Sequence, residues 1–484
     1  MTVEEKLKAH GKDMSGISAF CHHAHNRQDG DRFGRMFELP PLTLKSTDLK
    51  ALGAQKDTGG QDGPMNGGTS SNRTSTVGVG NVFFGQFIDH DITLDTVSSL
   101  AATAADASEI RNNRTPTLDL DNIYGAGPEA SPFLYHGNGD FTGVKLLTGA
   151  DITDASELEK NDLIRSIHDT AIIGDPRNDE NRIISQLQLA MINFHNQVVS
   201  HISTESAGEK KGKELFEEAR QITMWHYQWI VIHDFLVKMC GQAVVSDVLG
   251  NGRKFYNACH GDPYIPVEFS VAAYRFGHSM IPQKIQIQKN KPALELFGTL
   301  LGQGFKPLSD ERAVVDWLEL VESTAGRQVQ MAEKLDTKMA HDLLELPFIP
   351  SGEKSLATRN LLRGQAFLLP SGETIAKAVG RDDAEITQVS DAAQNTAGNN
   401  IDLSSGTPLW FYILAEAETI GRETTANNFD KGEGLGPVGA RIIAETIIGL
   451  IDLDPYSYLS VNRNWEPADG IGVTNLGEML SYTA

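Results

Sequence analysis

The chain has 484 residues, 40% of them hydrophobic, and a formal net charge of −22 at pH 7. This length and composition allow a soluble globular protein with a substantial core, in one large domain or two or three smaller ones. The negative charge argues against nucleic acid and anionic membranes as main partners, and it suits small substrates that are neutral or cationic.

Targeting signals and cysteine pairs give little information. No run of about 18 apolar residues is present, so we expect no membrane span. Residues 1–11 are charged and polar, unlike a secretory signal, which predicts a cytoplasmic protein or one secreted by a non-classical route. Cys21, Cys240 and Cys259 form no CxxC motif; one disulfide is allowed, but buried thiols are favoured. The histidines at 22, 23 and 25 favour a solvated segment over a metal site.

The predicted elements are mostly helices. Residues 54–81 are rich in Gly, Ser, Thr and Asn and predict a long loop. Apolar residues at helical spacing predict helices over 183–203 and 214–240, and further helices over 310–322, 326–345, 408–420 and 437–451. The best strand candidate is 284–288. We therefore expect a mainly α fold with long irregular loops and very little β: a single large domain over 31–484, after an N-terminal extension over 1–30.

The segment Gly85–Asp91 places His90 between Asp89 and Asp91 in a mostly apolar setting. An imidazole has a near-neutral reference pKa and can move a proton. Gln86 lies four residues earlier, so it would share a helix face with His90 and could orient water or a small polar substrate. The alternative is a structural histidine, so the chemistry needs partners from elsewhere in the chain.

Between residues 115 and 121 an oxygen-bearing side chain occupies every second position: Thr115, Thr117, Asp119 and Asp121. Alternate residues of an extended segment point to one side. Two carboxylates and two hydroxyls suit a hard cation such as Ca²⁺. A polar turn before a strand explains the pattern equally well. A carboxylate from outside the segment would favour the cation, and Asp91 is the candidate.

Arg177 and Glu180 lie three residues apart in the segment Gly174–Asn181, directly before the predicted helix over 183–203. At this spacing they would share one face at the start of that helix. A capping arrangement with an ion pair is the alternative, and it would contribute only roughly a few tenths of a kcal/mol.

Two positions further along the chain could hold a metal-bound cofactor. His278 lies in an apolar and aromatic segment beside Gly277, which would let a bulky group approach closely. A neutral imidazole there could ligate iron, although a core histidine is the simpler explanation. Asn360 could accept the second ring N–H of a ligating histidine and so fix its tautomer.

Taken together, these segments resemble the animal-type haem peroxidases of the peroxidase–cyclooxygenase superfamily. The resemblance covers roughly residues 30–465 and follows the family's order of motifs. It rests on Gln-x-x-Asp-His-Asp at 86–91, Gly-Asp-x-Arg-x-x-Glu at 174–180 and Arg-x-Gly-His at 275–278. Gly436–Arg441 and Leu453–Pro455 resemble the bacterial members of the family.

The resemblance implies a haem peroxidase that reduces H₂O₂, oxidises small organic donors or anions such as thiocyanate, iodide or bromide, and acts in the response to oxidative stress. His90 would be the distal acid–base residue, Arg177 would stabilise charge as the O–O bond breaks, and Gln86 would line the distal pocket. His278 would be the proximal iron ligand, with Asn360 as its hydrogen-bond partner and Arg363 on a haem propionate.

Two further features follow from the same resemblance. Asp89 and Glu180 match the carboxylates that esterify haem in mammalian members, which implies haem b with ester links. The family's calcium site corresponds to five residues here, and it would couple the ion to the neighbouring His90: Asp91, Thr115, Thr117, Asp119 and Asp121.

Three departures from the family limit the substrate prediction. Asn181 stands where the chlorinating mammalian enzyme carries a haem-bonded methionine, so a third link and efficient chloride oxidation are not expected. Gly364–Ala366 differs from the usual Arg-Asp-His-Gly run. Arg275 occupies the position of the cyclooxygenase radical tyrosine, and Tyr274 is one residue away. A haem-dependent fatty-acid oxygenase and a non-catalytic haem-bearing adhesion module are the alternatives. The natural electron donor and the oligomeric state stay open.

Overall fold

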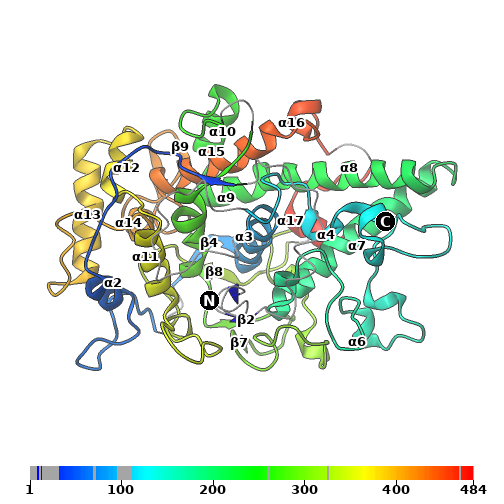
Figure 1. The fold of residues 1–484 in the computed structure, drawn as a ribbon, viewed down its shortest axis with the longest axis horizontal. Helices are drawn as coiled ribbons and strands as arrows, with labels where there is room; N and C mark the ends of the chain where they lie inside the picture. The colour runs from blue at the N-terminus through cyan, green and yellow to red at the C-terminus, as the bar shows by residue number, and fades with distance from the viewer. Residues whose placement is uncertain are drawn as a thin grey trace.

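The computed structural model describes residues 32–68, 72–94, 112–258, 262–323, 326–467 and 470–482, and the backbone of two short strands, β1 (Lys8–Ala9) and β2 (Lys12–Asp13). These residues form a mainly helical fold with long irregular connections, as predicted (Figure 1). The histidine triplet at 22–25, Cys21 and Cys259 lie outside the described residues; Cys240 is buried and free.

The helices fall into two groups along the chain. The first group lies in the first part of the chain: α2 (Ser46–Gly53), α3 (Val79–Ile92), α4 (Asp121–Tyr124), α5 (Gly127–Ala130), α6 (Glu157–Lys160), α7 (Arg182–Glu205), α8 (Gly212–Ile230), α9 (Val237–Cys240) and α10 (Gln242–Asn251). The second group follows: α11 (Leu356–Ala366), α12 (Gly372–Ala378), α13 (Asp383–Ala397), α14 (Leu409–Thr419), α15 (Pro437–Leu453), α16 (Tyr458–Val461) and α17 (Leu476–Leu480).

The strands in the described part of the chain pair only in twos. β3 (Phe33–Gly34) runs parallel to β5 (Ile265–Pro266). The antiparallel pairs are β4 (Arg73–Gly78) with β8 (Met331–Glu333), β6 (Lys284–Ile285) with β7 (Leu294–Glu295), and β9 (Arg422–Thr425) with β10 (Asn428–Asp430). Such short ribbons cannot form a layer of their own, so the core is built from helices.

Helix α3 lies near the middle of the molecule in Figure 1. All of its residues are buried except Gln86 and Asp89. Phe84 and Phe87 pack edge-on against Tyr227 of α8, with ring centroids 6.0 and 6.2 Å apart. A helix that is apolar almost all round is typical of a core element, and this one carries the first candidate motif inside the core.

Most of the predicted helices are confirmed. The predictions over 183–203, 408–420 and 437–451 correspond to α7, α14 and α15. Residues 214–240 are helical in three consecutive pieces, because a π-helical segment, η6 (Val231–Leu236), joins α8 to α9. Among the described residues, no helix has both the length and the apolar character needed to cross a membrane.

The helices predicted over 310–322 and 326–345 are wrong. The first region holds two 3-10 turns, η10 (Glu311–Ala313) and η11 (Trp317–Glu319), each capped by a preceding aspartate side chain. The second holds β8 and a 3-10 turn, η12 (His341–Leu344). Their apolar residues, such as Leu320 and Leu335, are buried by packing against distant segments, which produced a helix-like spacing without a helix.

Two smaller predictions are also corrected. The loop expected over 54–81 ends earlier, because residues 73–78 form β4 and α3 begins at Val79. The β-branched residues Thr74, Thr76 and Val77 favour a strand more strongly than the glycines around them disfavour it. Of the strand expected over 284–288, only Lys284–Ile285 pairs as β6.

Candidate active site

Helix α3 presents two of its polar residues differently from the rest of the helix. Gln86 and Asp89 are half-exposed, whereas His90 and Asp91 are fully buried. The Gln86 amide donates to Glu180 Oε1 at 2.5 Å, and Thr93 donates to Asp89 Oδ1 at 2.9 Å. The three acid–base residues of the motif therefore face three different environments.

His90 is held by an amide on the segment before α7. Its Nδ1 lies 2.7 Å from Oδ1 of Asn178, and both side chains are fully buried. Burial and the nearby Arg177 guanidinium lower the pKa of His90 to about 4. The imidazole is therefore neutral near pH 7, and a neutral imidazole can accept a proton.

Arg177 lies on a 3-10 turn, η5 (Pro176–Asp179), that is separate from α7. Its Nη2 donates to Asp175 at 2.7 Å and to the backbone carbonyl of His90 at 2.9 Å. Among the described residues, Arg177 pairs with Asp175 and Glu180 accepts from Gln86, so the alternative of a capping ion pair between Arg177 and Glu180 is wrong. Helix α7 is capped instead by the Asn181 side chain, which accepts from the Ile184 N–H at 3.0 Å.

A buried network of ion pairs also holds η5 in place. Arg165 donates to both oxygens of Asp179, at 2.7 and 2.8 Å, and also to Asp162 at 3.0 Å. Asp179 is 3% exposed, so losing its partner would leave a buried charge. This network fixes the turn that carries Arg177, Asn178 and Glu180.

The oxygen-rich segment meets Asp91 as predicted. One carboxylate oxygen from each of Asp91, Asp119 and Asp121 lies within 4.8 Å of the others. Thr115 donates to Asp119 at 3.1 Å, and Thr115, Thr117 and Asp119 share the half-exposed side of the segment. The segment continues into a helical turn, α4, so the alternative of a polar turn before a strand is wrong.

Burial and neighbouring carboxylates raise the pKa of Asp91 and of Asp119 in this cluster. Burial and the charges of Asp119 and Asp121 raise the pKa of Asp91 well above its usual range. Burial and Asp121 raise the pKa of Asp119 to about 7. Asp91 Oδ1 is buried and has no hydrogen-bond partner among the described residues. A cation between these oxygens would satisfy the charge and the orphaned oxygen together.

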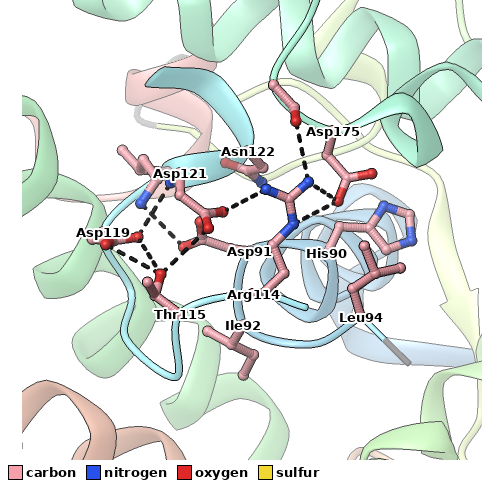
Figure 2. Close-up of polar contacts among 12 residues, drawn as sticks. His90, Asp91, Ile92, Leu94, Arg114, Thr115, Asp119, Asp121, Asn122 and Asp175 are labelled. Atoms are coloured by element: carbon pink, nitrogen blue, oxygen red, sulfur yellow. Dashed lines mark hydrogen bonds and ion pairs between the residues drawn. The ribbon is translucent and has the colours of Figure 1, made fainter. Parts of the chain in front are cut away.

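Arg114 connects this cluster to Asp175 (Figure 2), and Asp175 also pairs with Arg177. Its guanidinium donates to Asp121 at 3.0 Å and contacts Asp175 at 2.5 Å, and it is 1% exposed. Asp175 thus carries two buried guanidiniums. Although burial opposes its ionisation, Arg114 and Arg177 hold the pKa of Asp175 well below its usual range.

His278 lies on a 3-10 segment, η9 (Ala273–Met280), packed against α3. A Cβ atom added to Gly277 would lie 3.2 Å from Val82 of α3, so this glycine allows a close contact between η9 and α3. That a bulky group also approaches Gly277 stays a prediction. His278 itself is half-exposed, unlike a core histidine.

Asn360 of α11 meets His278 as predicted, with Nδ2 2.9 Å from His278 Nδ1. Arg275 donates to Oδ1 of the same amide at 3.2 Å. Because a guanidinium can only donate, this orientation turns the amide NH₂ toward the imidazole. A His278 that ligates iron through Nε2 would carry its proton on Nδ1, and Asn360 would then have to turn its Oδ1 toward the imidazole to accept it.

The remaining candidate, Arg363, is half-buried on the same helix as Asn360, and its guanidinium lies 5.1 Å from the centre of the Phe367 ring. Half-exposed polar residues on α3, η9 and α11 thus come from three segments far apart in the sequence. Their chemistry fits a haem: a histidine for iron, guanidiniums for propionates and carboxylates for the rim.

Sequence reasoning missed four residues that hold the site together: Arg114, Asp175, Asn178 and Gln188. Asp175 stands inside the Gly-Asp-x-Arg motif and Arg114 directly precedes Thr115, so both positions were visible. Arg114 and Asp175 pair with each other although they are 61 residues apart in the chain, and the spacing of nearby residues cannot predict such a pair. Asn178 occupies an unspecified position of the same motif and Gln188 lies outside it; both are uncharged, and no signal in one sequence distinguishes them.

Comparisons with known proteins identify the family of the chain. Residues 96–397 match the family model described as animal haem peroxidase. The chain is 25% identical over 217 residues to Dual oxidase 1 of Caenorhabditis elegans, covering 43% of this chain and 14% of that protein. It is 26% identical over 294 residues to thyroid peroxidase of Sus scrofa, covering 59% and 30%. The matches thus span less than a third of these curated relatives.

Solved structures show the same fold. Peroxidase A from Dictyostelium discoideum superposes with a TM-score of 0.61 at 16% identity, covering 94% of each chain. A fatty acid alpha-dioxygenase from Arabidopsis thaliana gives a TM-score of 0.54 at 16% identity, covering 91% of this chain and 76% of that one. The fold neighbours include two chemistries, so the fold alone does not select one. By its match over 96–397, the chain belongs to the animal haem peroxidase family.

Proposed function

We propose that the protein is a haem peroxidase that reduces H₂O₂ and oxidises small organic donors or anions such as thiocyanate, iodide or bromide. One observation carries this proposal. A buried neutral imidazole, His90, and a buried guanidinium, Arg177, are held together by the 2.9 Å bond from Arg177 to the His90 carbonyl. An acid–base group beside a fixed positive charge is what cleavage of an O–O bond needs.

The two side chains divide the work. Nε2 of His90 accepts the proton from one peroxide oxygen and returns it to the other, which then leaves as water. Arg177 stabilises the negative charge that develops on the leaving oxygen. Proton transfer of this kind contributes about 10²–10⁴-fold. Haem, when bound, would supply the two electrons that split the O–O bond and would recover two electrons from the donor.

The haem site would be formed by half-exposed and buried polar residues together. His278 would ligate iron through Nε2 with Asn360 on its Nδ1, and Arg363 would contact a propionate. Asp89 and Glu180 would form ester links to the haem, with Gln86 between them and the peroxide. Glu180 and Gln86 already lie in contact, which supports placing both on the distal side.

The cluster of oxygen-bearing side chains formed by Asp91, Thr115, Thr117, Asp119 and Asp121, called the oxygen cluster below, has a charge that suits Ca²⁺. Asp91, Asp119, Asp121 and Asp175 bring four carboxylates, and Arg114 and Arg177 bring two guanidiniums in direct contact with them. A divalent cation bound by Asp91, Thr115, Thr117, Asp119 and Asp121 would neutralise the remainder. Oxygen-only ligands and a partly open side match calcium better than zinc or copper.

A fatty-acid oxygenase is the weaker alternative. It requires a tyrosine near the haem that gives up a proton when it is oxidised. The Tyr274 hydroxyl is buried without a hydrogen-bond partner among the described residues, and burial raises its pKa well above the usual range. A phenol with no proton acceptor is a poor radical site, so peroxidase chemistry is favoured.

The test begins with the haem-loaded protein and near-stoichiometric H₂O₂. We expect the haem absorption spectrum to change within the mixing time and to return when thiocyanate, iodide or a phenol is added. The matched variant is His90→Gln, which keeps the size and hydrogen bonding of the side chain but removes the base. An unchanged spectrum of the parent protein, or oxygen uptake with polyunsaturated fatty acid in place of donor oxidation, would refute the proposal.

A further inference from the structure

A chain of buried amides runs from a backbone carbonyl to His90. Gln188 of α7 donates from Nε2 to the Asn122 carbonyl at 3.1 Å. Asn178 donates from Nδ2 to Gln188 Oε1 at 2.7 Å, and Asn178 Oδ1 lies 2.7 Å from His90 Nδ1. Asn122, Asn178, Gln188 and His90 are all fully buried.

The direction of every bond in this chain is set at its far end. The Asn122 carbonyl can only accept, so the NH₂ group of Gln188 must face it. The carbonyl oxygen of Gln188 then faces Asn178 and can only accept, so the NH₂ group of Asn178 must face Gln188. The carbonyl oxygen of Asn178 is left for His90, and it needs a proton on Nδ1.

We propose that Asn178 and Gln188 form an amide relay that fixes the tautomer of His90, with the proton on Nδ1 and the lone pair on Nε2. The two amides are positioning residues, since neither touches the reacting atoms. This inference rests on the proposed peroxidase function, because the fixed lone pair is useful only to a residue that takes a proton at Nε2.

The anchor of the relay belongs to the loop that carries the oxygen cluster. Asn122 directly follows Asp121, and its side chain lies 3.5 Å from the Phe87 carbonyl of α3. Gly174 presses against the same backbone, where an added Cβ would lie 2.6 Å from the Asn122 oxygen. The carbonyl therefore has little freedom to move, and the direction of the relay is held by the packing of three segments.

The chain offers a matched set of variants on one helix. Gln188→Met removes both bonds of the amide and keeps most of its volume. The carboxylic acid introduced by Gln188→Glu, protonated because it is buried, can still accept from Asn178 and donate to the Asn122 carbonyl. This variant should therefore keep the relay and the tautomer of His90. Gln186→Met is the control, because Gln186 is also buried on α7 and its amide also makes two hydrogen bonds, both to backbone groups, of Asn161 and Val315, but it does not contact the relay.

The measurement is ¹⁵N NMR of histidine-labelled, haem-loaded protein in its diamagnetic ferrous carbonyl form, with the His90 signals assigned by their loss in His90→Gln. Protonated and bare ring nitrogens have different shifts, so the tautomer is observed without turnover. We expect Nδ1–H alone in the parent, Gln188→Glu and Gln186→Met, and mixed tautomers in Gln188→Met. The rate with H₂O₂ should fall about 10–100-fold in Gln188→Met only.

The outcomes separate this inference from the proposed function. A proton on Nε2 in the parent protein, or a single unchanged tautomer in folded Gln188→Met, would overturn the relay. If the tautomer responds as expected but the parent protein does not react with H₂O₂, the relay stands as a structural feature and the peroxidase proposal fails. A second variant, Asn178→Leu, removes the acceptor itself and should give mixed tautomers if the relay holds; a single Nδ1–H form there would count against it.

Discussion

Substitution of Asp119 in the oxygen cluster should stabilise the protein without Ca²⁺ and destabilise it relative to the parent protein with Ca²⁺. Burial and the charge of Asp121 raise the pKa of Asp119 from 3.8 to about 7. At pH 7.5 and without an ion, Asp119 is therefore mostly ionised, and its ionisation lowers the stability of the folded state. Three pKa units correspond to about 4 kcal/mol, and we halve this to about 2 kcal/mol because Asp119 is half-exposed. Asp119→Asn should therefore stabilise the protein when a chelator is present.

Bound Ca²⁺ should reverse this order. An ion at about 1,000 times its dissociation constant stabilises the folded state by about 4 kcal/mol. Unfolding entropy is about 2.1 cal/mol/K per residue, which for 484 residues is on the order of 1 kcal/mol/K. The parent protein should then melt about 4 °C higher with Ca²⁺, while Asp119→Asn gains little and becomes the less stable of the two.

The assay is thermal unfolding by calorimetry at pH 7.5, in chelator and in excess Ca²⁺, for the parent protein, Asp119→Asn and Asp140→Asn. Asp140 is an exposed aspartate away from the cluster and serves as the charge-matched control. The expected result is a crossing of the melting order for Asp119→Asn alone. If Asp119→Asn were less stable than the parent by the same amount in both conditions, the cluster would be an ordinary hydrogen-bonded network.

Three further outcomes are expected. Arg177→Met should slow the reaction with H₂O₂ by at least about 10²-fold in stopped-flow absorbance, with the far-ultraviolet spectrum unchanged; a smaller loss would remove Arg177 from the reaction. Asp89→Asn and Glu180→Gln should each remove one haem anchor, measured by mass spectrometry after acid–butanone extraction; full extraction from the parent protein would exclude both links. Burial lowers the pKa of His195 from 6.5 to about 4, so stability present above pH 6.5 should fall by up to about 3 kcal/mol as the pH drops to 4. In His195→Gln the denaturant midpoint should lose this part of its pH dependence, and an identical dependence would contradict the assignment.

The parts of the site that the sequence predicts are those that share a short segment. Gln86, His90 and Asp91 lie within one helix, so helix geometry alone places their side chains. The oxygen side chains of Thr115–Asp121 recur at every second position, although the segment bends and Leu120 has a φ of 60°. The encounter of Asp91 with that stretch was a reasonable expectation because a cluster of oxygens needs one more charge. Two predicted helices failed where aspartate caps and strand pairing outweighed apolar spacing, as in residues 310–322.

A single sequence does not show which charged side chains pair with each other in the folded protein. Arg177 was expected beside Glu180 because they are three residues apart, yet it pairs with Asp175, two residues before it. The reason is the 3-10 turn, which breaks the helical spacing, and the second guanidinium of Arg114, which keeps Asp175 ionised inside the core. Both causes depend on how distant segments pack, and neither leaves a periodic signal.

These contacts link the oxygen cluster by two separate routes to His90 and Arg177, the two residues proposed to act on the peroxide. Asp91 is adjacent to His90 on α3, and Asp121 reaches Arg177 through Arg114 and Asp175. Loss of the ion would free Arg114 to pair more closely with the cluster, which would withdraw it from Asp175. One carboxylate would then hold Arg177 more tightly and its charge would be less available to a peroxide. Removal of Ca²⁺ should therefore slow peroxide reduction even where His90 keeps its tautomer, and Arg114→Met, which cuts this connection, should make the remaining rate less sensitive to the chelator.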